Sequence, residues 1–229
     1  MLEYHKIETC FKRDPGNLKR LIEGDWANPI FGYLAINKWV FTEKVDGTNI
    51  RVIITQIGGS RLTVNFGGKT DNASIPAMLV KVLGEKFLPL MNILQEMFPS
   101  GACLYGEGYG AKIQKGGGNY RLDQSFVLFD VLVPDPTGSK TWWLERHNIE
   151  DVAQKLGLDV VPIINKGTLH DMVEMAKTGF TSNWGSFKAE GIVARPEVEL
   201  KDRAGKRIIT KIKHKDFSTG GKYEDSITR

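Results

Sequence analysis

The sequence contains little cysteine and no long apolar run. Cys10 and Cys103 are the only two cysteines among 229 residues, and neither belongs to a C-x-x-C pair. This spacing argues against a disulfide framework and against a cysteine zinc site. No stretch approaches the roughly 20 apolar residues of a transmembrane helix, and the N-terminus has no apolar core of signal-peptide length. We therefore expect a cytosolic protein that acts without insertion into a membrane.

Motifs for several common kinds of chemistry are also absent. The four histidines have no metal-ligand spacing, and no serine lies in a G-x-S-x-G elbow. The segment "FGGKT" at 66–70 resembles the end of a P-loop, but Thr63 stands where that motif requires glycine. The glycines of "GEGYG" at 106–110 lack the helix that follows them in a dinucleotide-binding fold. The sequence thus gives no support for any of these sites.

The basic residues are unevenly distributed along the chain. There are 31 Lys and Arg against 27 Asp and Glu, which gives a net charge of +4. Residues 201–215, "KDRAGKRIITKIKHK", hold seven Lys or Arg and one Asp. Such a run is either a solvated face or a contact surface for a polyanion.

Apolar patterning indicates a mixed fold without a regular βαβ alternation, which favours the α+β class and a single domain over residues 1–229. The turn formers "DGTN" at 46–49 lie between two β-rich runs, so they predict a hairpin with Lys44 at a strand end. A helical run at 75–98 contains Gly84 and Pro89, which we expect to break or kink it. Strands are expected at 38–45, 50–57, 102–110, 125–133, 189–195 and 207–215, and helices at 75–98, 147–156 and 168–178. The last helix starts with Thr168 and Asp171, which predict a capping box.

Lys44 is a candidate nucleophile toward the α-phosphorus of a nucleotide. A lysine attacks only as the neutral amine, and its ordinary pKa of about 10.4 leaves little of that form at pH 7. Nearby cations lower such a pKa, and Lys211 and Lys213 are spaced to project from one face of a strand. Asp46 would act in the opposite sense if the strand continued through it, whereas a turn at 46–49 would let its carboxylate point elsewhere or meet a metal.

Two acids and one aromatic residue complete this group. Glu107 and Glu190 each adjoin a glycine in an apolar strand, where an unpaired acid would be unfavourable. They suit ribose hydroxyls or a metal, although an ordinary salt bridge is the alternative for either. Phe126 begins "FVLFD" and could stack on a base, while packing in the core is the usual role of such a residue.

Five segments in this order resemble motifs I, III, IIIa, IV and V of the covalent nucleotidyltransferase superfamily of ATP-dependent ligases and mRNA capping enzymes. They are "EKVDGTN" (43–49), "YGEGYG" (105–110), "FVLFD" (126–130), "EGIVAR" (190–195) and "KIK" (211–213). Within that superfamily, "WVFTEKVDGTN" and "YGEGYGAKIQKGGGNY" resemble RNA ligases of phages and their relatives, especially the branch that seals nicks in duplex RNA.

The resemblance implies an adenylyltransferase fold of antiparallel sheets flanked by helices, and a ligase that uses ATP with magnesium or manganese and carries AMP on Lys44. RNA would be the partner, as a nicked duplex or an RNA–DNA hybrid, in the cytoplasm, which for a phage-encoded protein is that of the host. The implied nucleotide contacts are Glu43, Asn49 near the phosphates, the basic Lys69, Glu107 on the ribose, Phe126 on adenine, Glu190 on the ribose or a metal, and Lys211 and Lys213 on the α-phosphate; Asp46 is a second metal candidate.

The sequence departs from the resemblance in one respect. After Lys213 only 16 residues remain, too few for the OB-fold of DNA ligases or the helical C-terminal domain of many RNA ligases. We therefore expect a minimal catalytic domain, in which residues 201–215 and the "KGGGN" loop contact the strand. The alternatives are a minimal DNA ligase, an inactive nucleic-acid-binding relative and, less favoured because of the missing domain, a GTP-using capping enzyme.

Overall fold

The computed structural model describes residues 3–57, 61–135, 137 and 139–217. They form two compact units, each treated by itself below. The first unit contains Val45–Pro162, Asn183–Phe187 and the N-terminal residues up to Lys6. The second contains Ile7–Lys44, Ile163–Ser182 and the residues from Lys188 onward. The expectation of a single domain stays a prediction.

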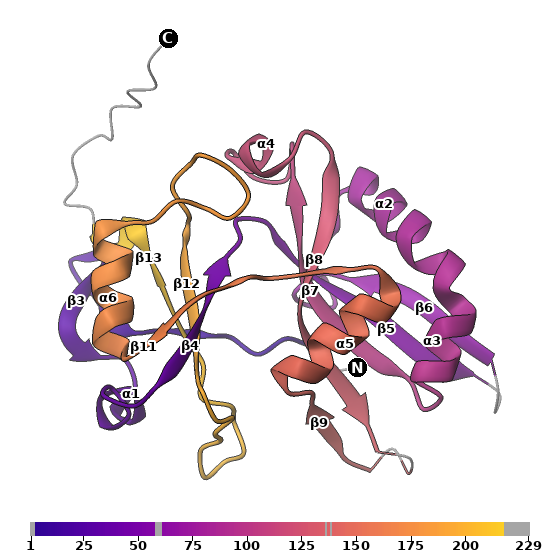
Figure 1. The fold of residues 1–229 in the computed structure, drawn as a ribbon, viewed down its shortest axis with the longest axis horizontal. Helices are drawn as coiled ribbons and strands as arrows, with labels where there is room; N and C mark the ends of the chain where they lie inside the picture. The colour runs from indigo at the N-terminus through magenta and orange to yellow at the C-terminus, as the bar shows by residue number, and fades with distance from the viewer. Residues whose placement is uncertain (1–2, 58–60, 136, 138, 218–229) are drawn as a thin grey trace. The chain divides into compact units, whose positions relative to one another are not determined.

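The first unit is built on a six-stranded sheet (Figure 1). Neighbouring strands are antiparallel, except that β10 runs parallel to β8. β-branched residues in alternation, Ile50, Val52 and Ile54, turn one face of β5 toward the core. In sheet order the strands are β10 (Asp159–Val160), β8 (Gln124–Pro134), β7 (Ala102–Gly110), β5 (Thr48–Ile57) and β6 (Arg61–Gly67). The remaining strand, β9 (Thr141–Trp143), pairs with the C-terminal part of β8.

Helices cover one face of this sheet. Apolar residues of α2 (Ala77–Phe87), α3 (Met91–Met97) and α5 (Arg146–Leu156) share a buried cluster with Ile50, Leu104 and Phe126 of the strands. The 3-10 turn η1 (Leu88–Leu90) separates α2 from α3, and the short helix α4 (Gly117–Tyr120) follows β7.

The second unit has a five-stranded sheet with the order β1-β13-β12-β4-β11. β12 runs antiparallel to both of its neighbours, β4 and β13, and β1 runs parallel to β13. The strands are β1 (Glu8–Thr9), β13 (Thr210–Lys213), β12 (Gly191–Pro196), β4 (Trp39–Lys44) and β11 (Ile163–Gly167).

The core of the second unit lies on one face of that sheet. Helix α6 (Leu169–Thr178) packs there, and a capping box of Thr168 and Asp171 starts it. Its apolar residues meet Trp39 and Phe41 of β4 together with α1 (Pro29–Tyr33) and the ribbon of β2 (Phe11–Asp14) and β3 (Asn17–Trp26). The 3-10 helix η2 (His214–Phe217) follows β13.

Several expectations from the sequence can be compared directly with the structure. The α+β class, the capping box, the chain break at Pro89 and the position of Lys44 at a strand end are confirmed, whereas Gly84 lies inside α2 without breaking it. The predicted hairpin is wrong, because β4 pairs with β11 and β12 while β5 pairs with β6 and β7. None of the helices in the described ranges has the length and apolar character needed to cross a bilayer.

Candidate active site

Lys44 and Lys213 belong to one row of the five-stranded sheet. The register of β12 aligns Gly191 with Lys44 of β4 on one side and with Lys213 of β13 on the other. Directly opposite residues of neighbouring strands share a face, so both lysine side chains leave the sheet on the same side. Buried residues alternate with them, since Phe41 and Ile212 lie in the core on the other face.

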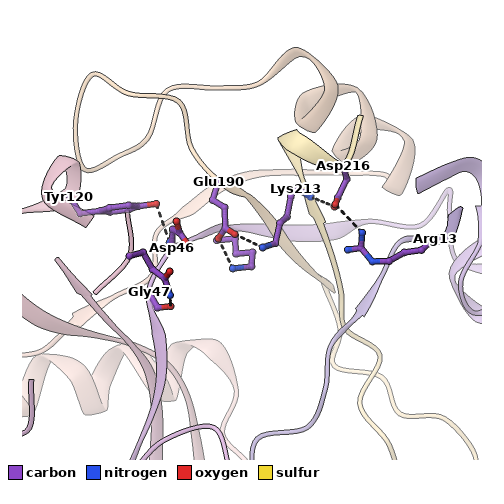
Figure 2. A network of polar contacts seen from close by, with 9 residues as sticks. Arg13, Asp46, Gly47, Tyr120, Glu190, Lys213 and Asp216 are labelled. Carbon is purple, nitrogen blue, oxygen red and sulfur yellow. Dashed lines mark hydrogen bonds and ion pairs between the residues drawn. The ribbon is translucent and has the colours of Figure 1, made fainter. Parts of the chain in front are cut away.

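Glu190 joins the two lysines. Its Oε2 lies 2.5 Å from Nζ of Lys44, and its Oε1 lies 2.5 Å from Nζ of Lys213. The side chain of Glu190 is 9% exposed, and those of Lys44 and Lys213 are 21% and 23% exposed. Figure 2 shows Glu190 and Lys213 pointing toward one another. A largely buried carboxylate thus lies between two ammonium groups.

The charge of Glu190 follows from these contacts. Burial by itself raises its pKa, but the charge of Lys44 and the hydrogen bond from Lys213 outweigh burial, so the pKa is lowered. Glu190 is therefore ionised at neutral pH. An adjacent anion stabilises the charged form of a lysine, whereas nucleophilic attack needs the neutral form. If Lys44 acts as a nucleophile, its ion pair with Glu190 has to open before the attack.

The end of β13 is fixed by a second set of contacts. The backbone N–H of Lys213 donates to Oδ2 of Asp216 at 2.9 Å, and Nη1 of Arg13 lies 3.4 Å from Oδ1 of the same carboxylate. Asp216 is 2% exposed. Figure 2 shows this chain of contacts from Lys213 through Asp216 to Arg13. Asp216 thereby links the backbone of Lys213 to Arg13 on β2.

In the first unit, Asn49 and Glu107 are directly opposite each other on β5 and β7. They share a face of the sheet with Val127, which is aligned with Glu107 on β8. Oδ1 of Asn49 is buried and finds no hydrogen-bond partner in the part of the chain that the structure describes. A buried acceptor without a donor is unfavourable, so this atom suits a ligand that donates a hydrogen bond.

Comparison with models of known protein families identifies the family of this chain. The family model for RNA ligase matches residues 37–213, which is most of the chain. The chain belongs to the RNA ligase family. All five motif segments lie within the matched range.

Solved structures of Naegleria gruberi RNA ligase have a similar fold. The structure with PPi has a TM-score of 0.59 and 19% identity, over 81% of this chain and 52% of that chain. A mutant with AMP and Mn gives 0.59 and 18% over 81% and 52%, and a mutant with ATP and Mn gives 0.57 and 20% over 82% and 54%. This RNA ligase family chain thus spans about half the length of those proteins, and the likeness confirms the expected nucleotidyltransferase fold.

One residue expected to contact the nucleotide, Glu43, lies on the core-facing side of its strand. Glu43 is 1% exposed and accepts a hydrogen bond from the Ser182 hydroxyl at 2.6 Å. It precedes Lys44 on β4, so the two side chains lie on opposite faces of the sheet. If Glu43 contacts a nucleotide on the face of Lys44, its backbone has to make that contact, because its side chain lies on the other face. Lys211 shares the face of Lys213 as predicted, but it is aligned with Val193 in the next row.

Phe126 is a fully buried core residue. It is aligned with Gly108, packs at 5.6 Å against Phe87, and belongs to the cluster under α2. Because Glu107 and Val127 occupy the other face, Phe126 does not share the face of Glu107. The structure gives no support to its predicted stacking on adenine. Phe129 is partly buried against the cluster that contains Val127, and the sequence signal that could have revealed it is the two-residue alternation within "FVLFD".

The remaining predicted site residues are Lys69 and the two metal candidates, Glu190 and Asp46. Lys69 is exposed and lies just after β6, and its predicted contact with the nucleotide stays a prediction. Within the described ranges no three His, Cys, Asp or Glu side chains are grouped to hold a metal ion. Both oxygens of Glu190 already contact lysines, and Asp46 lies two residues beyond Lys44. Either residue taken singly could give one carboxylate to a magnesium or manganese ion that is otherwise held by substrate phosphates and water.

Proposed function

We propose that this chain is an ATP-dependent RNA ligase that works through a covalent lysyl-AMP. Nζ of Lys44, as the neutral amine, attacks the α-phosphorus of ATP; a P–N bond forms, the nitrogen loses a proton to water, and pyrophosphate leaves with the electrons of the broken P–O bond. A 5′-phosphate of RNA then attacks the same phosphorus, and the P–N bond to Lys44 breaks. In the last step a 3′-hydroxyl attacks the phosphorus of the adenylylated 5′ end, gives up its proton, and AMP leaves as the strands are joined. The observation that carries this proposal is the row of Lys44 and Lys213 joined by Glu190.

The row explains how the first step is prepared. Before ATP binds, Glu190 holds the ammonium group of Lys44 in a fixed place, and its lowered pKa makes it a weak base, so it positions Lys44 and does not take its proton. Lys213 places a positive charge beside Lys44, where negative charge grows on the α-phosphate during attack. The phosphates of ATP offer both ammonium groups an alternative partner to Glu190. A magnesium or manganese ion on those phosphates would supply further positive charge to the same oxygens.

The remaining roles follow from the faces on which the side chains lie. We assign Glu107 to the ribose and the unpaired Oδ1 of Asn49 to a donor carried by the nucleotide or its bound water. Phe129 replaces Phe126 as the residue assigned to adenine, because it lies on the face of Glu107. Lys69 and Lys211 are assigned to phosphate groups, and Glu190 and Asp46 keep their assignment as metal contacts.

The test is transfer of label from α-labelled ATP to the protein in the presence of magnesium or manganese, followed by a denaturing gel. We expect a labelled band that disappears in Lys44→Ala and persists in Lys19→Ala, whose lysine is exposed on β3. A wild-type protein that takes no label, or a label that survives Lys44→Ala, contradicts the mechanism. Label from GTP in place of ATP would point to capping chemistry.

The substrate is tested separately with nicked duplexes. We expect faster sealing when the 3′-hydroxyl side of the nick is RNA than when it is DNA, since the chain belongs to the RNA ligase family. Faster sealing of DNA would favour a minimal DNA ligase. Label on Lys44 without sealing of any end would show that the chain completes adenylylation but does not ligate the ends tested.

A further inference from the structure

The turn that follows Lys44 is held by backbone contacts within the first unit. The N–H of Asp46 donates to the phenol oxygen of Tyr120 at 3.1 Å, and Nε2 of Gln114 donates to the carbonyl of Gly47 at 2.9 Å. A Cβ on Gly47 would lie 2.2 Å from the carbonyl oxygen of Gly108, so the turn also packs directly on β7. Figure 2 shows the ring of Tyr120 directed at this turn. Three contacts thus fix the residues just past the nucleophile.

Tyr120 is itself held rigidly. It ends α4, and two glycines bring that helix against the end of β7. A Cβ on Gly117 would lie 2.0 Å from the carbonyl oxygen of Gly110, and Gly110 has a φ of +118°, which favours glycine. Tyr120 is 8% exposed. A side chain so fixed can act as a rigid hydrogen-bond acceptor.

An aromatic cluster surrounds the Tyr120 ring. Ring centroids lie 4.8 Å away at Phe187, 5.8 Å at Trp184 and 6.1 Å at Tyr109, all in edge arrangements. Val45, the residue directly after Lys44, is 4% exposed and belongs to the same buried cluster. The ring therefore packs in the cluster that buries Val45, while the hydroxyl binds Asp46.

We propose that Tyr120 is a positioning residue for attack by Lys44. Its phenol oxygen and its ring fix the two residues that follow Lys44, and through the peptide bonds they fix the point from which the lysine side chain extends. This inference rests on the proposed function, because it concerns the adenylylation step. Attack on phosphorus requires close alignment of the amine, and misplacement by about 1 Å can cost on the order of 100-fold in rate.

The mechanism offers a readout that a merely structural role would not move. Lys44 is the nucleophile when ATP reacts with the protein, but it forms no bond when a pre-adenylylated RNA nick is sealed. Tyr120→Phe removes the hydroxyl and keeps the ring in its cluster. We expect it to slow single-turnover labelling by about 10-fold, to leave the half-saturating ATP concentration unchanged, and to leave sealing of a pre-adenylylated nick unchanged.

The matched control is Tyr33→Phe, which removes a hydroxyl from a tyrosine that is 83% exposed, and it should change neither rate. Melting temperatures of both variants confirm that they are folded in the assay. If Tyr120→Phe labels as fast as wild type, or if labelling and sealing slow equally, the positioning role is overturned. A wild-type protein that takes no label overturns the proposed function itself, which is a different result.

Discussion

Lys44 and Lys213 lie on either side of Gly191 in one row of the five-stranded sheet, and the carboxylate of Glu190 contacts both amines. Lys211 lies on the same face but in the row of Val193 and Thr42. The two lysines of "KIK" are therefore not equivalent. Lys213 is level with Lys44, and Lys211 is displaced by one step of the pleat.

This difference predicts unequal effects of the two lysine substitutions. Lys213→Ala removes the positive charge level with Lys44, so labelling by α-labelled ATP should slow by about 100-fold. Lys211→Ala should slow it by about 10-fold, because its charge acts from the next row. Single-turnover labelling rates at saturating ATP measure both. Equal losses, or a larger loss in Lys211→Ala, would contradict the assignment made from the register.

Gly191 should be intolerant of any side chain. A Cβ there would lie 2.2 Å from the carbonyl oxygen of Ile212 and 2.7 Å from Cα of Lys213, and both are backbone atoms. β12 and β13 would have to separate, so we expect Gly191→Ala to lower the free energy of unfolding by about 1–3 kcal/mol through overpacking. Gly118→Ala is the control, since a Cβ at Gly118 meets nothing within 4 Å. Urea unfolding curves that coincide for the two variants would refute the close approach.

The stability that Glu190 contributes should depend on pH. Its folded pKa is lowered below the ordinary value of 4.5, so the contribution is present above about pH 4.5 and is lost as the pH falls through the folded pKa. At pH 7 we expect Glu190→Gln to lower the free energy of unfolding by about 1–3 kcal/mol, because two charged hydrogen bonds are weakened.

The measurement for Glu190 is urea unfolding of wild type and Glu190→Gln at pH 7 and at several lower pH values. The gap between them should narrow below about pH 4.5. The matched control is Glu85→Gln, which alters an exposed carboxylate on α2 and should show a small gap at pH 7. A gap for Glu190→Gln that widens in acid would mean that the carboxylate is not paired with the lysines in the folded protein.

The local features of the site could be read from the sequence. A strand end at Lys44, the shared face of Lys211 and Lys213, and the capping box of α6 each depend on residues close together in the chain. Alternation and capping express local backbone geometry, so they survive without knowledge of the tertiary structure.

The pairing of the strands could not be read in the same way. The turn formers after Lys44 show that the chain changes direction, but they do not say which strands become neighbours. β4 instead pairs with β12, and Lys44 meets Glu190 across 146 positions of sequence. Such contacts depend on burial of whole faces, which a short pattern does not encode.

The sequence also did not show which face of β8 packs in the core. Substitutions of the two phenylalanines of "FVLFD" test the assignment of faces made from the structure. Phe126 packs under α2, so Phe126→Leu should lower the free energy of unfolding by about 1–3 kcal/mol and leave the half-saturating ATP concentration unchanged. Phe129→Leu keeps apolar bulk but removes the ring on the face of Glu107, so that concentration should rise by about 10-fold. Labelling rates over a range of ATP concentrations, together with urea unfolding, separate the two effects. If Phe126→Leu raised the ATP requirement and Phe129→Leu did not, adenine would have to reach the α2 side of the sheet, and the assignment of faces would be wrong.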